Sequence, residues 1–171
     1  MGLKYPLRPS GSGLALHLRA FTIVIARLAV GLVFVAHGWQ KFVDAGIDQT
    51  AAGFDSMGVP APQFSAYAVA SIEMVAGAAL ILGVLLPLAG ILLAGVMIGA
   101  LVMVHWPTFY VGNGGYEFVL VLAAASLMIG FSGGGTWSID GAIASSRAKR
   151  EAAEASDSVV EPSAETSASQ N

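Results

Sequence analysis

Cysteine is absent from all 171 residues of the chain. Its absence excludes a disulfide relay, a persulfide carried on this chain and any metal or iron–sulfur cluster bound by thiolates. If the protein takes part in redox or sulfur chemistry, a partner protein or a bound cofactor therefore has to carry the reactive group.

Charged residues are also scarce. They make up 11% of the chain, against about 25% in a typical soluble domain, whereas hydrophobic residues make up 56%. The few charges gather at the two ends and in the first loop, and no basic stripe suited to nucleic acid is present. The composition predicts an integral membrane protein that is surrounded by a lipid bilayer and does not bind nucleic acid.

The hydrophobic residues gather in four stretches, each close to the ~20 residues that cross a bilayer as a helix. The stretches are 20–43, 64–86, 88–106 and 116–132, and Pro87 marks a tight turn between the second and the third. Small residues recur in all of them, which lets membrane helices approach closely. We therefore predict an all-α membrane fold, a bundle of four transmembrane helices.

Three parts are expected along the chain: a basic arm (1–19), the membrane domain (20–143) and a polar tail (144–171). The tail lacks apolar periodicity and is expected to be disordered, above all over 151–171. The basic start also resembles a secretory signal, but Arg27 interrupts the apolar stretch that follows, so an uncleaved first helix is preferred.

Basic residues predict the orientation. Clusters of basic residues occur only in the arm and at Arg147, Lys149 and Arg150, whereas the loop after the first stretch has no Lys or Arg. The positive-inside rule and an even number of spans both place the two termini in the cytoplasm. The predicted location is the plasma membrane.

The first stretch carries polar residues at a depth where each costs about 2.5–3.5 kcal/mol. At about 100° per residue, His37 lies beside one narrow stripe made of Arg27, Gly31, Phe34, Gly38 and Lys41. This stripe is expected to face protein. Gly31 and Gly38 on the stripe, and Gly77 in the second stretch, are expected to be structural residues. Gly95 and Gly99 form a G-x-x-x-G pair that we expect to pack inside the bundle, with a homodimer seam as the alternative.

Depth along the helices predicts an ion pair between Arg27 and Glu73. At 1.5 Å per residue, Arg27 lies about 10 Å inside the cytoplasmic boundary and Glu73 about 14 Å below the outer one. A core of about 30 Å then leaves roughly 6 Å between them, within reach of an arginine side chain. The pair is either structural, fixing the helix register, or it contacts a ligand or relays protons.

A second polar cluster is expected at the outer ends of the helices, from His37, Lys41, His105 and Glu117. One interpretation is structural: Lys41 extends to the interface, the histidines bind loop carbonyls and Glu117 pairs with Lys41. The other is a small polar pocket for a quinone headgroup or a small anion. Metal or haem ligation by the histidines is a weaker alternative with no specific spacing, so no metal site is predicted.

Several runs of residues resemble the DoxX family of small four-helix membrane proteins. They are Arg27–Lys41 (RLAVGLVFVAHGWQK), Met57–Pro62 (MGVPAP), Glu73–Gly83 (EMVAGAALILG), Gly114–Glu117 (GGYE) and Ser138–Asp140 (SID). They occur in family order over roughly residues 20–143. The tail is not part of this pattern.

The resemblance implies a link to redox chemistry. The family is similar to membrane subunits of thiosulfate:quinone oxidoreductases, and related actinobacterial members are associated with a complex that contains superoxide dismutase and a thiosulfate sulfurtransferase. The cofactor stays unknown, and the resemblance makes a quinone a candidate for it and soluble redox proteins candidate partners. It also implies functional roles for Arg27, His37, Lys41, Glu73, His105 and Glu117, and Asp140 belongs to its closing motif.

Three functions are therefore weighed. The first is a membrane subunit of an oxidoreductase complex, linked to a quinone or a small anion; the sequence does not decide whether the subunit is itself catalytic. The second is a non-catalytic membrane anchor for partner proteins. The third is a path for a small solute or protons along Arg27, Glu73 and His37, for which no broken helix or inverted repeat is visible.

Overall fold

The structure is a computed structural model that describes residues 13–132 and 137–160. The long helices are α1 (Gly13–Trp39), α3 (Pro62–Leu82), α4 (Leu86–Ala100), α5 (Glu117–Phe131) and α6 (Ile139–Val160). Shorter elements are the π-helical turns η1 (Gln40–Asp44) and η2 (Leu101–His105), the helix α2 (Ile47–Ser56) and the 3-10 turn η3 (Val111–Asn113). The described residues contain no strand, which confirms the all-α class.

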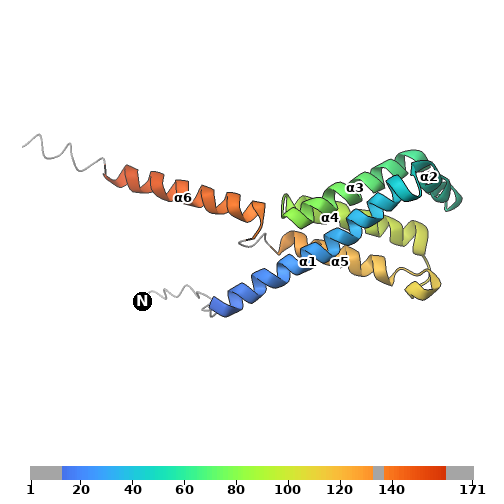
Figure 1. Ribbon diagram of the computed structural model, residues 1–171, viewed down its shortest axis with the longest axis horizontal. Helices are drawn as coiled ribbons and strands as arrows, with labels where there is room; N and C mark the ends of the chain where they lie inside the picture. Colours follow the sequence, from blue (N-terminus) through green and yellow to red (C-terminus); the bar gives the residue numbers. More distant parts are fainter. Residues whose placement is uncertain (1–12, 133–136, 161–171) are drawn as a thin grey trace, which may run out of the picture.

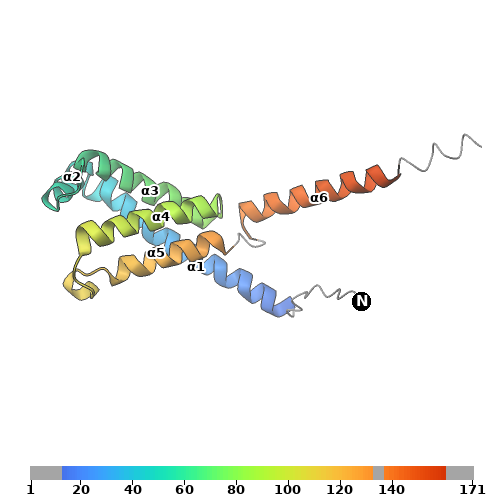
Figure 2. The same cartoon turned by 180° about the vertical axis from the view of Figure 1, so that it is seen from behind.

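Three segments are long and apolar enough to cross a membrane: Gly13–Asp44, Pro62–Leu82 and Leu86–His105. The apolar helix α5 is shorter, with 15 residues. Helix α1 lies along α3, and α4 lies along α5 (Figures 1 and 2). We name the two ends of this bundle by what lies there: the turn end carries the α3–α4 turn (Gly83–Leu85), and the loop end carries α2 and η3.

Helix boundaries differ from the predicted spans at three places. Helix α1 begins at Gly13, seven residues before the predicted start at residue 20, and α2 forms within a predicted loop. The turn after α3 lies at Gly83–Leu85 rather than at Pro87, because Gly83 adopts the left-handed conformation (φ 71°) that commonly ends a helix. Pro87 instead lies in the first turn of α4, where a missing N–H costs nothing.

The predicted disorder of the tail is wrong for residues 144–160, which continue helix α6. This segment is rich in Ala, Glu, Lys and Arg, which have high intrinsic helix propensity even without a packed face. Figure 1 shows α6 extending away from the bundle. Residues 161–171 lie outside the described part of the chain.

The stripe predicted on the first helix is confirmed as its protein-facing side, with Arg27, Gly31, Phe34 and Gly38 all buried. The two glycines bring the α1 backbone onto α3. A Cβ atom added at Gly31 would lie 2.8 Å from the carbonyl oxygen of Gly77, and one at Gly38 would lie 2.8 Å from that of Ala70. Only glycine allows such close helix contact, which is how membrane helices commonly associate.

The packing role predicted for Gly95 and Gly99 is wrong. A Cβ atom added at either residue would meet nothing within 4 Å. The close contact between α4 and α5 is made instead by Gly90, whose Cβ would lie 2.6 Å from the carbonyl oxygen of Ser126, and by Gly130, whose Cβ would lie 2.9 Å from that of Leu86. The spacing of Gly95 and Gly99 is the right one for packing, but their side of α4 has no helix against it.

These contacts predict opposite effects of the same substitution at two glycines of the membrane helices. Gly31→Ala adds a methyl group against Gly77 and Ile81, so we expect it to lower the free energy of unfolding by about 1–3 kcal/mol. Gly95→Ala adds the same group in open space and gains helix propensity, so its stability is expected to be unchanged or higher by up to about 1 kcal/mol. Thermal unfolding in detergent measures both. Equal melting temperatures for the two variants would contradict this packing.

Candidate functional site

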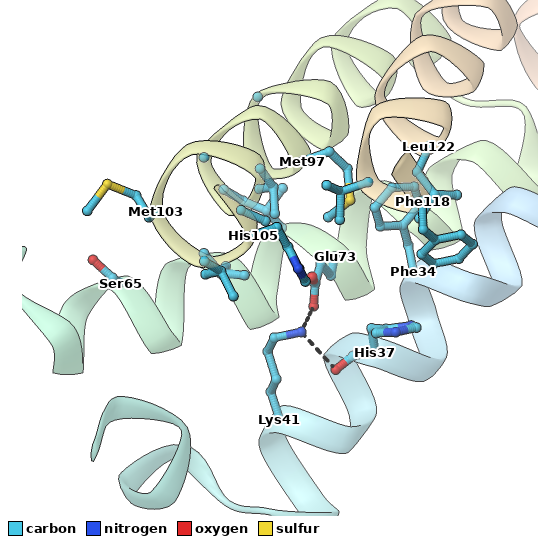
Figure 3. Close-up of a pocket in the computed structure, with 18 of the residues that line it drawn as sticks. Phe34, His37, Lys41, Ser65, Glu73, Met97, Met103, His105, Phe118 and Leu122 are labelled. Atoms are coloured by element: carbon cyan, nitrogen blue, oxygen red, sulfur yellow. Dashed lines mark hydrogen bonds and ion pairs between the residues drawn. The ribbon is translucent and has the colours of Figure 1, made fainter. Parts of the chain in front are cut away.

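A cavity of about 800 Å³ lies at the loop end of the bundle, between α1, α3, α4 and α5, and α2 also contributes to it. Most of its wall is apolar, as Figure 3 illustrates with Phe34, Met97, Met103, Phe118 and Leu122. Its polar side chains include His37, Lys41, Glu73 and His105. A largely apolar wall with a few polar groups is typical of sites for small organic molecules.

An ion pair lies at the polar part of the cavity. Lys41 Nζ donates to Glu73 Oε2 at 2.7 Å, and it also donates to the carbonyl of His37 at 3.4 Å (Figure 3). The Glu73 residue is only 3% exposed, and Lys41 is 20% exposed. A buried carboxylate needs such a partner, because an unpaired charge in apolar surroundings costs several kcal/mol, by order of magnitude. Lys41 therefore points back along the helix toward Glu73 rather than outward to the interface.

Two helices that carry polar cavity residues end in a π-helical turn. Lys41 lies in η1, which continues α1, and His105 ends η2, which continues α4. A π turn changes the direction of the side chains that follow from that of a regular α-helix, and such turns are frequent at functional sites. Nothing in the sequence pattern indicates these turns, and a rotation of 100° per residue holds only for a regular α-helix.

The histidines are held by backbone carbonyls. Nδ1–H of His105 donates to the carbonyl of Gly114 at 2.7 Å, and Nδ1–H of His37 donates to the carbonyl of Val33 at 2.8 Å. A carbonyl oxygen only accepts, so Nδ1 of each ring carries a proton. The predicted loop carbonyl is confirmed as the partner of His105, whereas the partner of His37 belongs to its own helix.

Glu117 does not join this cluster. Its Oε1 accepts from the backbone N–H of Val111 at 2.7 Å, so it ties the loop around η3 to the start of α5. The predicted pairing of Glu117 with Lys41 is therefore wrong, because Lys41 is bound to Glu73.

The predicted ion pair between Arg27 and Glu73 is also wrong. Arg27, which is 3% exposed, lies at the turn end. It donates from Nε to the carbonyl of Leu80 at 3.0 Å, and from Nη2 to those of Ile81 at 3.1 Å and Trp137 at 3.2 Å. Leu80 and Ile81 lie in the last turn of α3, two turns beyond Glu73. The prediction failed because it counted depth from an assumed start at residue 20, whereas the structure pairs Arg27 with the last turn of α3, seven residues beyond Glu73.

Asp140 completes a second polar cluster at the turn end. Its carboxylate accepts from the backbone N–H groups of Leu85 and Leu86, both at 3.1 Å, and so caps the start of α4. Its negative charge also attracts the guanidinium of Arg27. We call Arg27 and Asp140 the turn clasp. It joins α1, the α3–α4 turn and the start of α6, and neither residue lines the cavity.

The structure thus brings four of the six candidate positions to one cavity and separates the other two. His37, Lys41, Glu73 and His105 line it, whereas Arg27 and Glu117 bind backbone groups elsewhere. The sequence reasoning missed the apolar part of the site, including Met97, Met103 and Phe118. Gly95 and Gly99, which also line the cavity, did give a signal, but it was read as helix packing. Within residues 13–132 and 137–160, no group of three or more His, Asp or Glu residues is placed to hold a metal ion.

Comparison with known proteins shows what the chain is similar to. Residues 22–106 match the family model described as DoxX. The protein of Bacillus subtilis (strain 168) described as "Putative oxidoreductase CatD" is 31% identical, over 62% of this chain and 76% of its own length. The protein of Mycobacterium tuberculosis (strain ATCC 25618 / H37Rv) described as "Uncharacterized membrane protein Rv3486" is 34% identical, over 70% of this chain and 79% of its own length. No solved structure matches the chain significantly.

The cavity ion pair can be tested by a double-mutant cycle. The single variant Glu73→Leu leaves the charge of Lys41 without its partner in apolar surroundings, and Lys41→Met does the same to the charge of Glu73. We expect each single variant to lose about 3 kcal/mol of unfolding free energy. The double variant Lys41→Met, Glu73→Leu buries no charge and is expected to recover most of that loss. Denaturation in detergent gives the three values. A double variant that loses the sum of the two single losses would contradict a direct pair.

The turn clasp predicts a specific requirement for arginine at position 27. Arg27→Lys keeps the charge but cannot donate to three separate carbonyls from a rigid planar group, so we expect a loss of about 1–3 kcal/mol. The control is Arg19→Lys, because Arg19 is on the exposed part of the same helix. Thermal unfolding compares the two. If Arg27→Lys is as stable as the control, the clasp does not hold this end of the bundle.

Proposed function

Since the chain belongs to the DoxX family, we propose that it is the membrane subunit of an oxidoreductase system and that its cavity binds the ring of a membrane quinone. The observation that carries this proposal is the 800 Å³ cavity with the Lys41–Glu73 ion pair at its polar part. The similar Bacillus subtilis protein described as "Putative oxidoreductase CatD" adds support from outside the structure.

The size and the wall of the cavity favour a quinone over a small anion. Sites of about 300–1,000 Å³ with mostly apolar walls typically hold organic molecules with a ring or a chain. A small anion needs an uncompensated positive charge, whereas the charge of Lys41 is already balanced by Glu73. A quinone ring carries no charge and needs only donors for its carbonyl oxygens. Lys41 provides such a donor at the cavity wall.

The chemistry of the cavity residues is suited to proton transfer. Reduction of a quinone to a quinol takes two electrons and two protons, one for each carbonyl oxygen. Lys41 and the histidines can hold and release protons, and Glu73 can take one from Lys41 across their hydrogen bond. The chain has no cysteine, so a reduced partner protein or a bound cofactor supplies the two electrons. This chain therefore supplies the site and the protons.

The arrangement of the ends supports four spans with both termini in the cytoplasm. Asp140, which follows α5, contacts the α3–α4 turn, and Arg27 of α1 lies at the same end. Helix α5 thus leads from the loop end back to the turn end, although it has only 15 residues. The basic residues Arg147, Lys149 and Arg150 follow on the side of the turn end, which we assign to the cytoplasm of a cell with this protein in its plasma membrane.

A membrane anchor for partner proteins is the second candidate, and helix α6 favours it. This helix extends away from the bundle, so most of its surface is open to another protein (Figure 2). A homo-oligomer is compatible with either function. The path for a small solute or protons along Arg27, Glu73 and His37 is not supported, because Arg27 lies at the turn end whereas His37 lies at the loop end.

The quinone site is tested by what the protein retains when purified in a mild detergent. We expect a lipophilic quinone to co-purify with the unchanged protein and to be identified by mass spectrometry of an organic extract. Lys41→Met removes the charged donor, so the retained quinone should fall about tenfold or more. Glu117→Gln is the matched control, because Glu117 binds the loop backbone and does not line the cavity.

The same preparation separates the two candidate functions. A protein that neither retains quinone nor binds added quinone, while remaining folded, would overturn the quinone site. If it still retains a partner protein, and loses that partner when α6 is deleted, the anchor function is the correct one.

A further inference from the structure

The two glycines that do not pack have no role in the proposed function so far. Gly95 and Gly99 lie one turn apart on α4, both are exposed, and both line the cavity. Their neighbours on the same side, Ile91 and Leu92, are 51% and 40% exposed and line it too. The cavity is therefore not enclosed by α4, and it reaches the surface of the bundle along this side of the helix.

This opening lies within the membrane-spanning part of the bundle. Gly95 is nine residues after the start of α4, and Glu73 is nine residues before the end of α3. Because the two helices are joined by a short turn, both residues lie about 14 Å from the turn end at 1.5 Å per residue. The opening is thus at the depth of the ion pair, and the surroundings there are lipid tails rather than water.

The shape of the helix pair is consistent with such an opening. Helices α3 and α4 lie close together at the turn and diverge toward the loop end (Figures 1 and 2). On α3, Ser65, Val69 and Ile72 line the cavity, and on α4 the lining includes the two glycines. A glycine has no side chain to fill the space between diverging helices, so the space stays open.

We propose that the cavity takes its ligand sideways from the bilayer, between α3 and α4 across Gly95 and Gly99, and that the ligand is an uncharged amphiphile whose long apolar tail stays in this opening. This proposal rests on the proposed function and specifies its substrate class: a quinone with an isoprenoid tail rather than a water-soluble one. The ring moves at constant depth to Lys41 and Glu73, so neither ring nor tail has to pass through water.

The test compares two probes with the same ring, a long-tailed isoprenoid quinone and its tail-less analogue, on protein reconstituted in lipid nanodiscs. Gly95→Leu and Gly99→Leu fill the opening. We expect each variant to bind the long-tailed quinone about tenfold more weakly, because about two methylene groups of the tail then lose their contacts with the protein. Binding of the tail-less analogue should change less than about twofold. Ala124→Leu is the control, because Ala124 is exposed on α5 and does not line the cavity.

The outcomes separate the opening from the site. If the unchanged protein binds the long-tailed quinone and the glycine variants bind it equally well, the opening is overturned and the quinone site stands. If the glycine variants bind both probes equally more weakly, the opening is also overturned, because the substitutions have then altered the site of the ring rather than that of the tail. If the unchanged protein binds neither probe, the proposed function fails, and this inference fails with it. Gly95→Ala, which is expected to fold, should give a smaller loss in the same direction.

Discussion

The close antiparallel contact between α1 and α3 is the constraint on which the rest of the structure depends. Lipid gives two helices no hydrophobic reason to associate, so contact relies on close packing and on polar groups that need partners. Gly31 lies against Gly77 and Gly38 lies against Ala70, backbone to backbone. These two contacts fix both the distance and the register of the helices. From that register it follows that Arg27 reaches the last turn of α3 and that Lys41 reaches Glu73.

The two polar clusters that result have different chemistry. At the turn end, the charges of Arg27 and Asp140 are bound mainly by backbone carbonyl and N–H groups, which do not titrate or move independently. At the loop end, Lys41 and Glu73 bind each other through side chains next to a cavity. Side chains can exchange partners and protons with a ligand, whereas helix ends cannot without local unfolding. The loop end is therefore where we place the function, and the turn end is where we place the stability.

Helix periodicity was enough to predict which residues share one face of a helix. It was not enough to predict how two helices align or what packs against a given face. The stripe from Arg27 to Gly38 was correct because 100° per residue holds within one helix. The Arg27–Glu73 pair was wrong because it rested on assumed membrane boundaries, whereas the packing of α1 on α3 places Arg27 level with Leu80, seven residues or about 10 Å beyond Glu73. Gly95 and Gly99 were misread because spacing identifies a smooth helix face but not what lies against it. His37, Lys41 and His105 line one cavity, whereas Glu117, expected in the same cluster, does not. The apolar part of that cavity depends on how α3 and α4 diverge, which no local pattern encodes.

The energetics of the two clusters also distinguish their roles. The last turn of any helix has carbonyl groups that lack donors within the helix, and in an apolar environment they must find one elsewhere. Arg27 supplies a donor to Ile81 and another to Leu80, whose carbonyl also accepts from the backbone N–H of Gly83, so an apolar residue at position 27 takes the Arg27 donor away from both carbonyls. The fold does not require the Lys41–Glu73 pair in this way, because two apolar side chains of similar size are expected to fill the same space at little or no cost in stability. Stability alone thus accounts for Arg27 but not for Lys41 and Glu73. An ion pair that the fold does not require, placed on the wall of a large apolar cavity, fits the quinone site that we propose.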